Sequence, residues 1–239
     1  MECLTKISAI IVALNEEVLI EQIIGELKKQ KYDGGFEIIL ADGGSSDNTV
    51  NLAKAHNVQV VCSEKKGKSF QMNAAAKRAK GQILFFVHAD MQFPDSVFTA
   101  IAEALKSGHS GGGFANEYDY KNEKIKRLGN LMNFRIFDKR EQSDKGIFYG
   151  DNGIFVLKEA FEEINGFKEI SIMEDYDFST RMCRKYRTIK IYNPKILVSS
   201  RRHVKVGFLK TRLQWIIIRT LYKWGVSPNY LGKLYKDIR

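Results

Sequence analysis

The stretch Gly81-Gln-Ile-Leu-Phe-Phe-Val-His88-Ala-Asp90 decides the fold of this chain. Its five consecutive apolar residues, 83–87, are too few for a helix and are typical of a strand that is buried on both faces. In open α/β sheets, ligands bind at the carboxyl edge, where such a strand ends. His88 and Asp90 stand two residues apart and so face the same side. The stretch therefore predicts a cation site at that edge, with a plain surface turn as the alternative.

The residues before this strand alternate between strand and helix patterns. Three further strands are expected over 7–13, 37–41 and 58–61, and apolar residues at helical spacing predict a helix over 19–27. Strands that alternate with helices imply parallel pairing and right-handed crossovers. The sequence thus predicts an α/β fold, a Rossmann-like, doubly wound sheet of the nucleotide-binding type.

Beyond Pro94 the pattern is looser. It predicts helices over 97–105 and 125–136, a strand over 114–118 that the glycines 111–113 lead into, and a short strand over 154–157. This half should complete a mixed sheet and shape a second substrate's pocket, with the loops 111–113 and 150–153 contributing to it. No linker is long enough to separate a second domain.

Composition narrows the class of protein. The 239 residues are 44% hydrophobic, which is ordinary for a globular chain with a core. The cysteines Cys3, Cys62 and Cys183 lack metal-type spacing, and no signal-peptide pattern or run of about 20 apolar residues occurs. These features predict a cytoplasmic protein that does not span a membrane.

The net charge of +10 is concentrated at the end of the chain. Residues 201–239 contain ten Lys or Arg and a single acid, Asp237. Apolar residues at 209, 213, 217, 221 and 224 would form one arc of a helix there, opposite basic residues at 212, 219 and 223. We expect an amphipathic helical tail on the inner face of the cell membrane, on the protein's own core or on a second subunit. A nucleic-acid binder would more often spread its basic residues over the whole fold.

Four other motifs carry chemistry. Asp42-Gly43-Gly44-Ser45 follows the second strand, so Asp42 is placed to accept a hydrogen bond from a base or sugar, whereas Asp47 suits a helix cap. Lys68 opens a helix after Gly67, where backbone N–H groups and an ammonium can face a diphosphate, although a solvated charge run would look the same.

Acidic and basic clusters mark the last third of the chain. Glu174, Asp175 and Asp177 begin a helix, where mutual repulsion favours a general base and dipole compensation is the alternative. In Ser199-Ser200-Arg201-Arg202-His203 the guanidiniums could hold phosphate oxygens, and His203 could bind a metal or lie on the surface.

Taken in order, these motifs resemble family 2 glycosyltransferases of the GT-A fold. The likeness runs from residue 7 to about residue 203. It is carried by Ala13-Leu14-Asn15-Glu16-Glu17, Asp42-Gly43-Gly44-Ser45, Gly67-Lys68, Gln71-x-Asn73, His88-Ala89-Asp90 and Glu174-Asp175. The resemblance implies an inverting transfer of a sugar from a nucleotide diphosphate donor, usually a UDP-sugar, to an acceptor hydroxyl.

The resemblance also assigns roles to residues. Leu14, Asn15 and Glu16 would border the nucleoside, with Asp42 accepting from the base and Lys68 helping to hold base or phosphate. Because the leaving diphosphate gathers negative charge, Lys68 and Arg201 are also expected to stabilise it. Asp90 would end the DxD element that binds Mn²⁺ or Mg²⁺, His88 and His203 are further candidate ligands, and the Glu174-Asp175 pair would supply the catalytic base, Asp175. It also implies a division into residues 1–203, comprising a nucleotide-sugar half (1–95) and an acceptor half (96–203), followed by a basic tail (204–239).

Two departures from the family pattern matter. His88 stands in place of the first aspartate of DxD, and Asp-Gly-Gly-Ser replaces the more common Asp-Asp-Gly-Ser. No QxxRW element is present, which argues against a processive polymer synthase. The acceptor is left open and could be lipid-linked. A sugar nucleotidyltransferase and a non-catalytic membrane- or anion-binding module are the competing interpretations; the latter leaves Asp42, Asp90 and Asp175 without a purpose.

Overall fold

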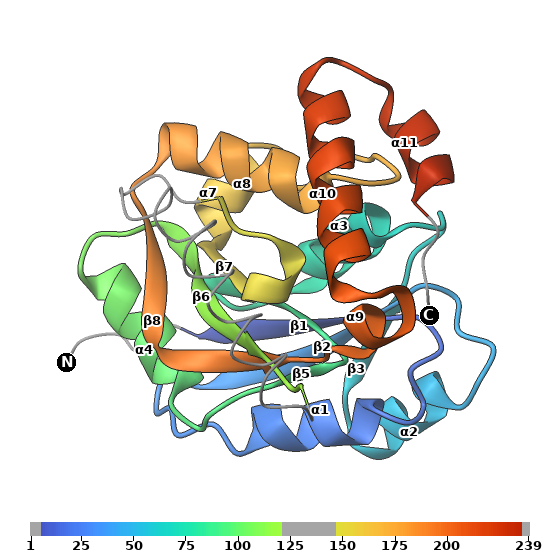
Figure 1. Ribbon diagram of the computed structural model, residues 1–239. Coiled ribbons are helices and arrows are strands. Elements are labelled where there is room, and N and C mark those ends of the chain that lie inside the picture. The colour runs from blue at the N-terminus through green and yellow to red at the C-terminus, as the bar shows by residue number, and fades with distance from the viewer. Residues whose placement is uncertain (1–5, 121–146, 236–239) are drawn as a thin grey trace.

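A single mixed sheet forms the centre of the molecule (Figure 1). The structure, a computed structural model, describes residues 6–120 and 147–235. Within them the sheet has eight strands in the order β3-β2-β1-β4-β7-β6-β8-β5. The strands from β3 to β4 run parallel, β7 pairs antiparallel with β4 and β6, and β8 runs parallel to β6. The predicted doubly wound mixed sheet is therefore confirmed.

The first half of the chain follows the predicted alternation closely. Every residue of β1 is buried, as is every residue of β4 except His88, because both strands lie in the interior of the sheet. The elements of this half are β1 (Ile7–Ala13), α1 (Ile20–Lys28), β2 (Phe36–Asp42), α2 (Thr49–Ala55), β3 (Gln59–Cys62), α3 (Lys68–Arg78) and β4 (Ile83–His88).

The second half adds strands that the sequence patterns did not predict, chiefly β8 and the two-residue β5 at the sheet's edge. Its elements are β5 (Met91–Gln92), α4 (Val97–Lys106), β6 (Gly111–Tyr118), η2 (Gly150–Asn152), β7 (Ile154–Leu157), α7 (Lys158–Glu163), α8 (Glu174–Lys185), β8 (Thr188–Val198), α9 (Arg201–Val206), α10 (Phe208–Lys223) and α11 (Pro228–Leu234). The helix predicted over 125–136 lies outside the described residues.

Helices cover the sheet on both faces. Side chains of a strand alternate between faces, so Ile7, Ala9 and Ile11 of β1 enter one core and Ile10 and Val12 the other. The first core includes residues of α1, α2 and α4, and the second includes residues of α3, α7 and α8. Figure 1 shows the two layers on opposite sides of the strands. Burial on both faces explains the uninterrupted apolar run of β4.

The glycines 111–113 are not a loop, contrary to expectation. They begin β6, which lies between β7 and β8. A Cβ added at Gly112 would stand 2.0 Å from the carbonyl oxygen of Ile189 on β8, so only glycine allows the strands to approach this closely. These glycines therefore serve strand packing rather than a pocket.

The C-terminal segment folds back onto the domain as three helices. Ile218 and Leu231, from α10 and α11, are buried together with Ile172, Met173 and Tyr176 at the start of α8. One side of the predicted amphipathic helix thus packs on the protein's own core. In the described part of the chain no helix is both long enough and apolar enough to cross a bilayer.

Candidate active site

The carboxyl ends of β1, β2 and β4 meet beside a large cavity. β1 lies between the other two strands, with Ala13 opposite Asp42 and Val12 opposite His88. The strand order reverses at β1, between β2 and β4, and such a switch point is where doubly wound folds bind ligands. The cavity has a volume of about 1220 Å³. The sheet edge at which the sequence predicts a ligand site therefore borders a cavity.

The loops after β1 and β2 hold each other in place. Asn15 has a positive φ of 55°, and its Oδ1 accepts a hydrogen bond of 2.8 Å from the backbone of Ser46. Asp42 is only 2% exposed and accepts a 2.9 Å hydrogen bond from the Gly44 N–H. Asp42 thus organises its own glycine turn, and its contact with a base stays a prediction. The residues predicted to border the nucleoside do line the cavity: Leu14, Asn15 and Glu16.

Arg201 connects the segments that follow β1 and β4. Its guanidinium donates to both carboxylate oxygens of Glu16, at 3.2 and 2.9 Å, and lies 3.1 Å from Asp90 Oδ2. Burial raises the pKa of Asp90, while the charge of Arg201 opposes that shift. Arg201 therefore reaches the same edge of the sheet as the ends of β1 and β4, and its role toward a diphosphate stays a prediction.

The predicted metal ligands do not converge on one point. Asp90 faces Arg201, whereas Nε2 of His88 points at Gly150, where an added Cβ would be only 2.6 Å away. His203 is stacked on Tyr120 and hydrogen-bonds to its hydroxyl. Across residues 6–120 and 147–235, no three His, Cys, Asp or Glu side chains are grouped to hold a metal ion. All three residues line the cavity, so Asp90 stays the predicted ligand and His88 and His203 stay candidates.

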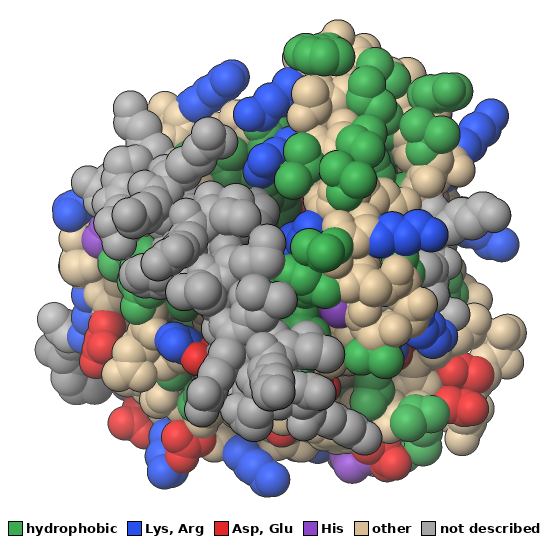
Figure 2. Space-filling view, viewed as in Figure 1, with side chains coloured by type: hydrophobic (Ala, Val, Ile, Leu, Met, Phe, Trp, Pro, Cys, Tyr) green, Lys and Arg blue, Asp and Glu red, His purple; other side chains and the backbone are tan. Residues whose placement is uncertain are grey.

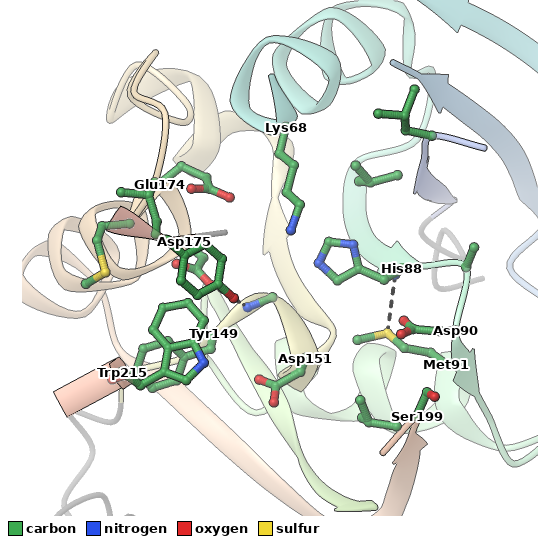
Figure 3. A pocket seen from close by; sticks show the side chains of 18 of the residues that line it. Lys68, His88, Asp90, Met91, Tyr149, Asp151, Glu174, Asp175, Ser199 and Trp215 are labelled. Atoms are coloured by element: carbon green, nitrogen blue, oxygen red, sulfur yellow. Dashed lines mark hydrogen bonds between the residues drawn. The ribbon is translucent and has the colours of Figure 1, made fainter. Parts of the chain in front are cut away.

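Lys68 projects into the cavity from the first turn of α3 (Figure 3). Burial raises the pKa of both Asp90 and Asp175, and the charge of Lys68 opposes that shift in each. Figure 3 shows the ammonium between the two carboxylates. The other polar residues of that motif are structural, because Gln71 donates to the Ala13 carbonyl at 3.3 Å and Asn73 exchanges two hydrogen bonds with the backbone of residue 167. Lys68 is therefore the member of the motif best placed for an anion.

Asp175 begins α8 on the far side of the cavity from Asp90. Its oxygens accept hydrogen bonds from the N–H groups of Gly150, at 2.8 Å, and Tyr176, at 2.7 Å. Burial, followed by the charge of Glu174, raises the pKa of Asp175 to about 6. A carboxylate with a pKa near neutrality is matched to proton transfer. The geometry thus suits the predicted general base.

A second carboxylate, Asp151, was not singled out from the sequence. It lies in η2 and lines the cavity, and its Oδ2 accepts a 3.0 Å hydrogen bond from Tyr118. Burial, and more weakly the charge of Asp175, raises its pKa. An aspartate in a Gly-Asp-Asn-Gly run resembles an ordinary turn residue, so composition could not reveal it.

The helix α10 forms part of the cavity wall. Arg212, Trp215 and Arg219 all line the cavity, and Figure 3 shows the Trp215 ring beside Tyr149. Arg219 donates to the Tyr149 hydroxyl at 3.3 Å. Part of the predicted tail is therefore a wall of the site.

Solved structures share this fold. TarS from S. aureus, in complex with UDP-GlcNAc, superposes with a TM-score of 0.66 at 16% identity, covering 81% of this chain and 58% of TarS. The mannosyltransferase PcManGT from Pyrobaculum calidifontis, with GDP-Man and Mn²⁺, gives a TM-score of 0.59 at 20% identity, covering 81% of this chain and 56% of that one. The fold is the GT-A glycosyltransferase fold.

Curated relatives match over part of the chain. The dolichol-phosphate mannosyltransferase of Pyrococcus furiosus is 30% identical over 108 residues, which is 43% of this chain and 31% of the relative. The undecaprenyl-phosphate 4-deoxy-4-formamido-L-arabinose transferase of Proteus mirabilis is 25% identical over 117 residues, or 45% and 36%. The chain spans about a third of the length of both. The sequence model of glycosyl transferase family 2 matches residues 8–165, and the chain belongs to that family.

Proposed function

We propose that this chain is an inverting, non-processive glycosyltransferase that moves a sugar from a UDP-sugar to an acceptor hydroxyl. The observation that carries the proposal is the arrangement in Figure 3, where Lys68 and Asp90 face Asp175 across one cavity. Family membership and the UDP-GlcNAc complex of TarS, a protein with the same fold, support this assignment.

The donor lies along the ends of β1, β2 and β4. Leu14, Asn15 and Glu16 border the nucleoside, and Lys68 and Arg201 hold the diphosphate. Negative charge develops on the diphosphate as the glycosidic bond breaks. Fixed cations that stabilise this charge more in the transition state than in the ground state accelerate the reaction.

The Asp90 carboxylate is a suitable ligand for a divalent cation, Mn²⁺ or Mg²⁺. Mg²⁺ is commonly held by one or two carboxylates, with substrate phosphates and water completing the shell. Such an ion supplies Lewis-acid stabilisation of the departing diphosphate. Arg201 must then release Asp90 and turn to the phosphates. His88 and His203 have other neighbours, so this proposal rests on Asp90 alone.

Asp175 removes the proton from the acceptor hydroxyl. The base works from the side of the cavity opposite the leaving group, so a single displacement inverts the anomeric carbon. Glu174 keeps the pKa of Asp175 raised, which makes the carboxylate a stronger base at neutral pH.

The test is the variant Asp175→Asn with Asp33→Asn as its matched control, since Asp33 is exposed and lies outside the cavity. We expect Asp175→Asn to lower the release of UDP from a panel of UDP-sugars by about 10²-fold or more while UDP affinity, measured by calorimetry, is retained. Loss of UDP affinity would reassign the residue. Release of pyrophosphate from a nucleoside triphosphate and a sugar phosphate would identify a nucleotidyltransferase instead.

The outer face of the C-terminal helices supports a peripheral position on the inner membrane leaflet. Eight of the ten exposed large hydrophobic residues in the described chain lie between 204 and 234. Residues 204–235 also contain six bases and no acid. Figure 2 shows the apolar side chains gathered over α10 and α11, with basic groups around them. Apolar side chains that insert among headgroups, together with cations, are what bind a helix to an anionic bilayer.

A membrane position suits a lipid-linked acceptor, the class named for the two relatives that use dolichol phosphate and undecaprenyl phosphate. In a flotation assay, we expect the protein to rise with vesicles that contain anionic lipid. The double variant Leu213→Ser/Trp224→Ser should remain unbound at the bottom of the gradient. A soluble dimer that dissociates in the same double variant, without flotation of the parent protein, would assign the face to a second copy instead.

A further inference from the structure

The inner face of α10 presents two guanidiniums and an indole to the cavity. Arg212, Trp215 and Arg219 are separated by three and four residues, so helical spacing places them on one face. All three line the cavity. The stripe is distinct from the exposed residues of the same helix, such as Leu213 and Ile217.

This stripe lies close to the predicted base. Arg219 donates to the Tyr149 hydroxyl at 3.3 Å, and the next residue, Gly150, donates its N–H to Asp175 at 2.8 Å. In Figure 3, Trp215 and Tyr149 lie together below Asp175 and face the same space. Both rings therefore border the space in front of Asp175.

The wall around the rings carries a surplus of positive charge. Among the described residues that line the cavity, the bases are Lys66, Lys68, Lys190, Arg201, Arg212, Arg219 and Lys233, and the acids are Glu16, Asp90, Asp151, Glu174 and Asp175. The pKa of Asp151 is raised by burial although Arg212 and Lys190 oppose the shift, and the pKa of Asp175 is raised to about 6. A neutral hydroxyl compound gains little from such a wall.

We propose that this wall is an acceptor subsite for a phosphate group, with Arg212 and Arg219 as its ligands. A ring or chain next to the phosphate lies on Trp215 and Tyr149. Guanidinium groups suit this role because their fork of N–H donors matches phosphate oxygens. The inference rests on the proposed transferase function and narrows its acceptor to a phosphorylated hydroxyl compound, either soluble or a lipid headgroup.

The chain contains only two tryptophans, which provides a direct probe. Trp224 is 78% exposed and lies outside the cavity, so Trp224→Phe leaves Trp215 as the single reporter of the subsite. In this background, with UDP saturating the donor half, we expect glucose 6-phosphate to change Trp215 fluorescence saturably and glucose to leave it unchanged.

Substitutions then identify the phosphate ligands. Arg212→Gln and Arg219→Gln should each weaken binding of glucose 6-phosphate by about tenfold or more, as expected for a lost hydrogen bond between charged groups. Arg184→Gln is the matched control, because Arg184 is exposed on α8 and does not line the cavity. Arg219→Lys, which keeps the charge, should recover part of the affinity and guards against a variant that merely misfolds.

A second probe separates the two sources of phosphate. Dodecyl phosphate that binds at least about tenfold more tightly than glucose 6-phosphate, with the same dependence on the arginines, identifies a lipid headgroup. Equal or weaker binding identifies a soluble acceptor. Equal binding of glucose and glucose 6-phosphate, or phosphate binding that survives Arg212→Gln/Arg219→Gln, overturns the subsite. A different result refutes the proposed function: a parent protein that neither binds UDP nor turns over a nucleotide sugar.

Discussion

The variant Glu174→Gln tests the electrostatics of the base most directly. The pKa of Asp175 is raised to about 6, first by burial and then by the charge of Glu174. Removing that like charge favours the ionised carboxylate, so the pKa must fall. Two carboxylates roughly 6–8 Å apart at an effective dielectric of about 30–40 repel by about 1–2 kcal/mol, or about one pKa unit. The acidic limb of the plot of kcat/KM against pH should therefore move to lower pH by about one unit.

The expected numbers are easily measured. With a pKa of about 6, roughly nine-tenths of Asp175 is ionised at pH 7 and about one-tenth at pH 5, so kcat/KM falls about tenfold between them. In Glu174→Gln about half remains ionised at pH 5, so the activity at that pH, relative to the variant's own plateau, should be about fivefold higher. The assay is UDP release between pH 4.5 and 8.5.

Two further variants make the result specific. Lys68 lowers the pKa of Asp175, so Lys68→Met should move the acidic limb to higher pH, opposite to Glu174→Gln. Glu162→Gln, on the outer face of α7, should not move it. If the acidic limb of the Glu174→Gln profile stays at the same pH or moves to higher pH, Asp175 is not the group whose ionisation controls the rate. Movement in the same direction for Glu174→Gln and Lys68→Met would indicate general disturbance of the site instead.

Two other predictions address the fold and the donor half. Gly112→Ala drives a Cβ against the Ile189 carbonyl, 2.0 Å away, and should lower the free energy of unfolding in urea by about 1–3 kcal/mol; Gly25→Ala, where the space is open, should raise it by up to about 1 kcal/mol. Arg201→Gln frees Asp90, so Mn²⁺ should bind the ligand-free protein up to about fivefold more tightly, as titration by electron paramagnetic resonance will report. Unchanged Mn²⁺ affinity would mean that the ion does not meet Asp90.

The parallel half of the sheet was predictable because its signals are local. A strand buried on both faces needs a run of apolar residues, and the polar residue that ends it marks the sheet edge directly. The positions of His88 and Asp90 at the end of β4 therefore followed from one stretch of ten residues. The strand β8 was not predicted because Lys190, Asn193 and Pro194 interrupt its apolar pattern. Near the edge of the sheet, such residues are tolerated without a core on both sides.

The contents of the site were harder to predict, because they depend on contacts between distant segments. Nothing in the residues around His88 indicates that its ring turns to Gly150, more than sixty positions later. The ion pair between Glu16 and Arg201 joins residues 185 positions apart. Sequence could place each motif at the correct edge, but the tertiary structure decides which side chains meet there.

The helix α10 connects the two proposals made for the acceptor. Its 16 residues are one rigid element of about 24 Å, held to α8 by the buried Ile218. One face carries Arg212 and Arg219 into the cavity, and the other leaves Leu213 exposed to the surroundings. A bilayer that binds the outer face therefore fixes the orientation of the inner one. A phosphate at the membrane surface would then meet the guanidiniums without a separate movement of the enzyme, so the order of the basic and apolar residues along this helix would itself select the acceptor.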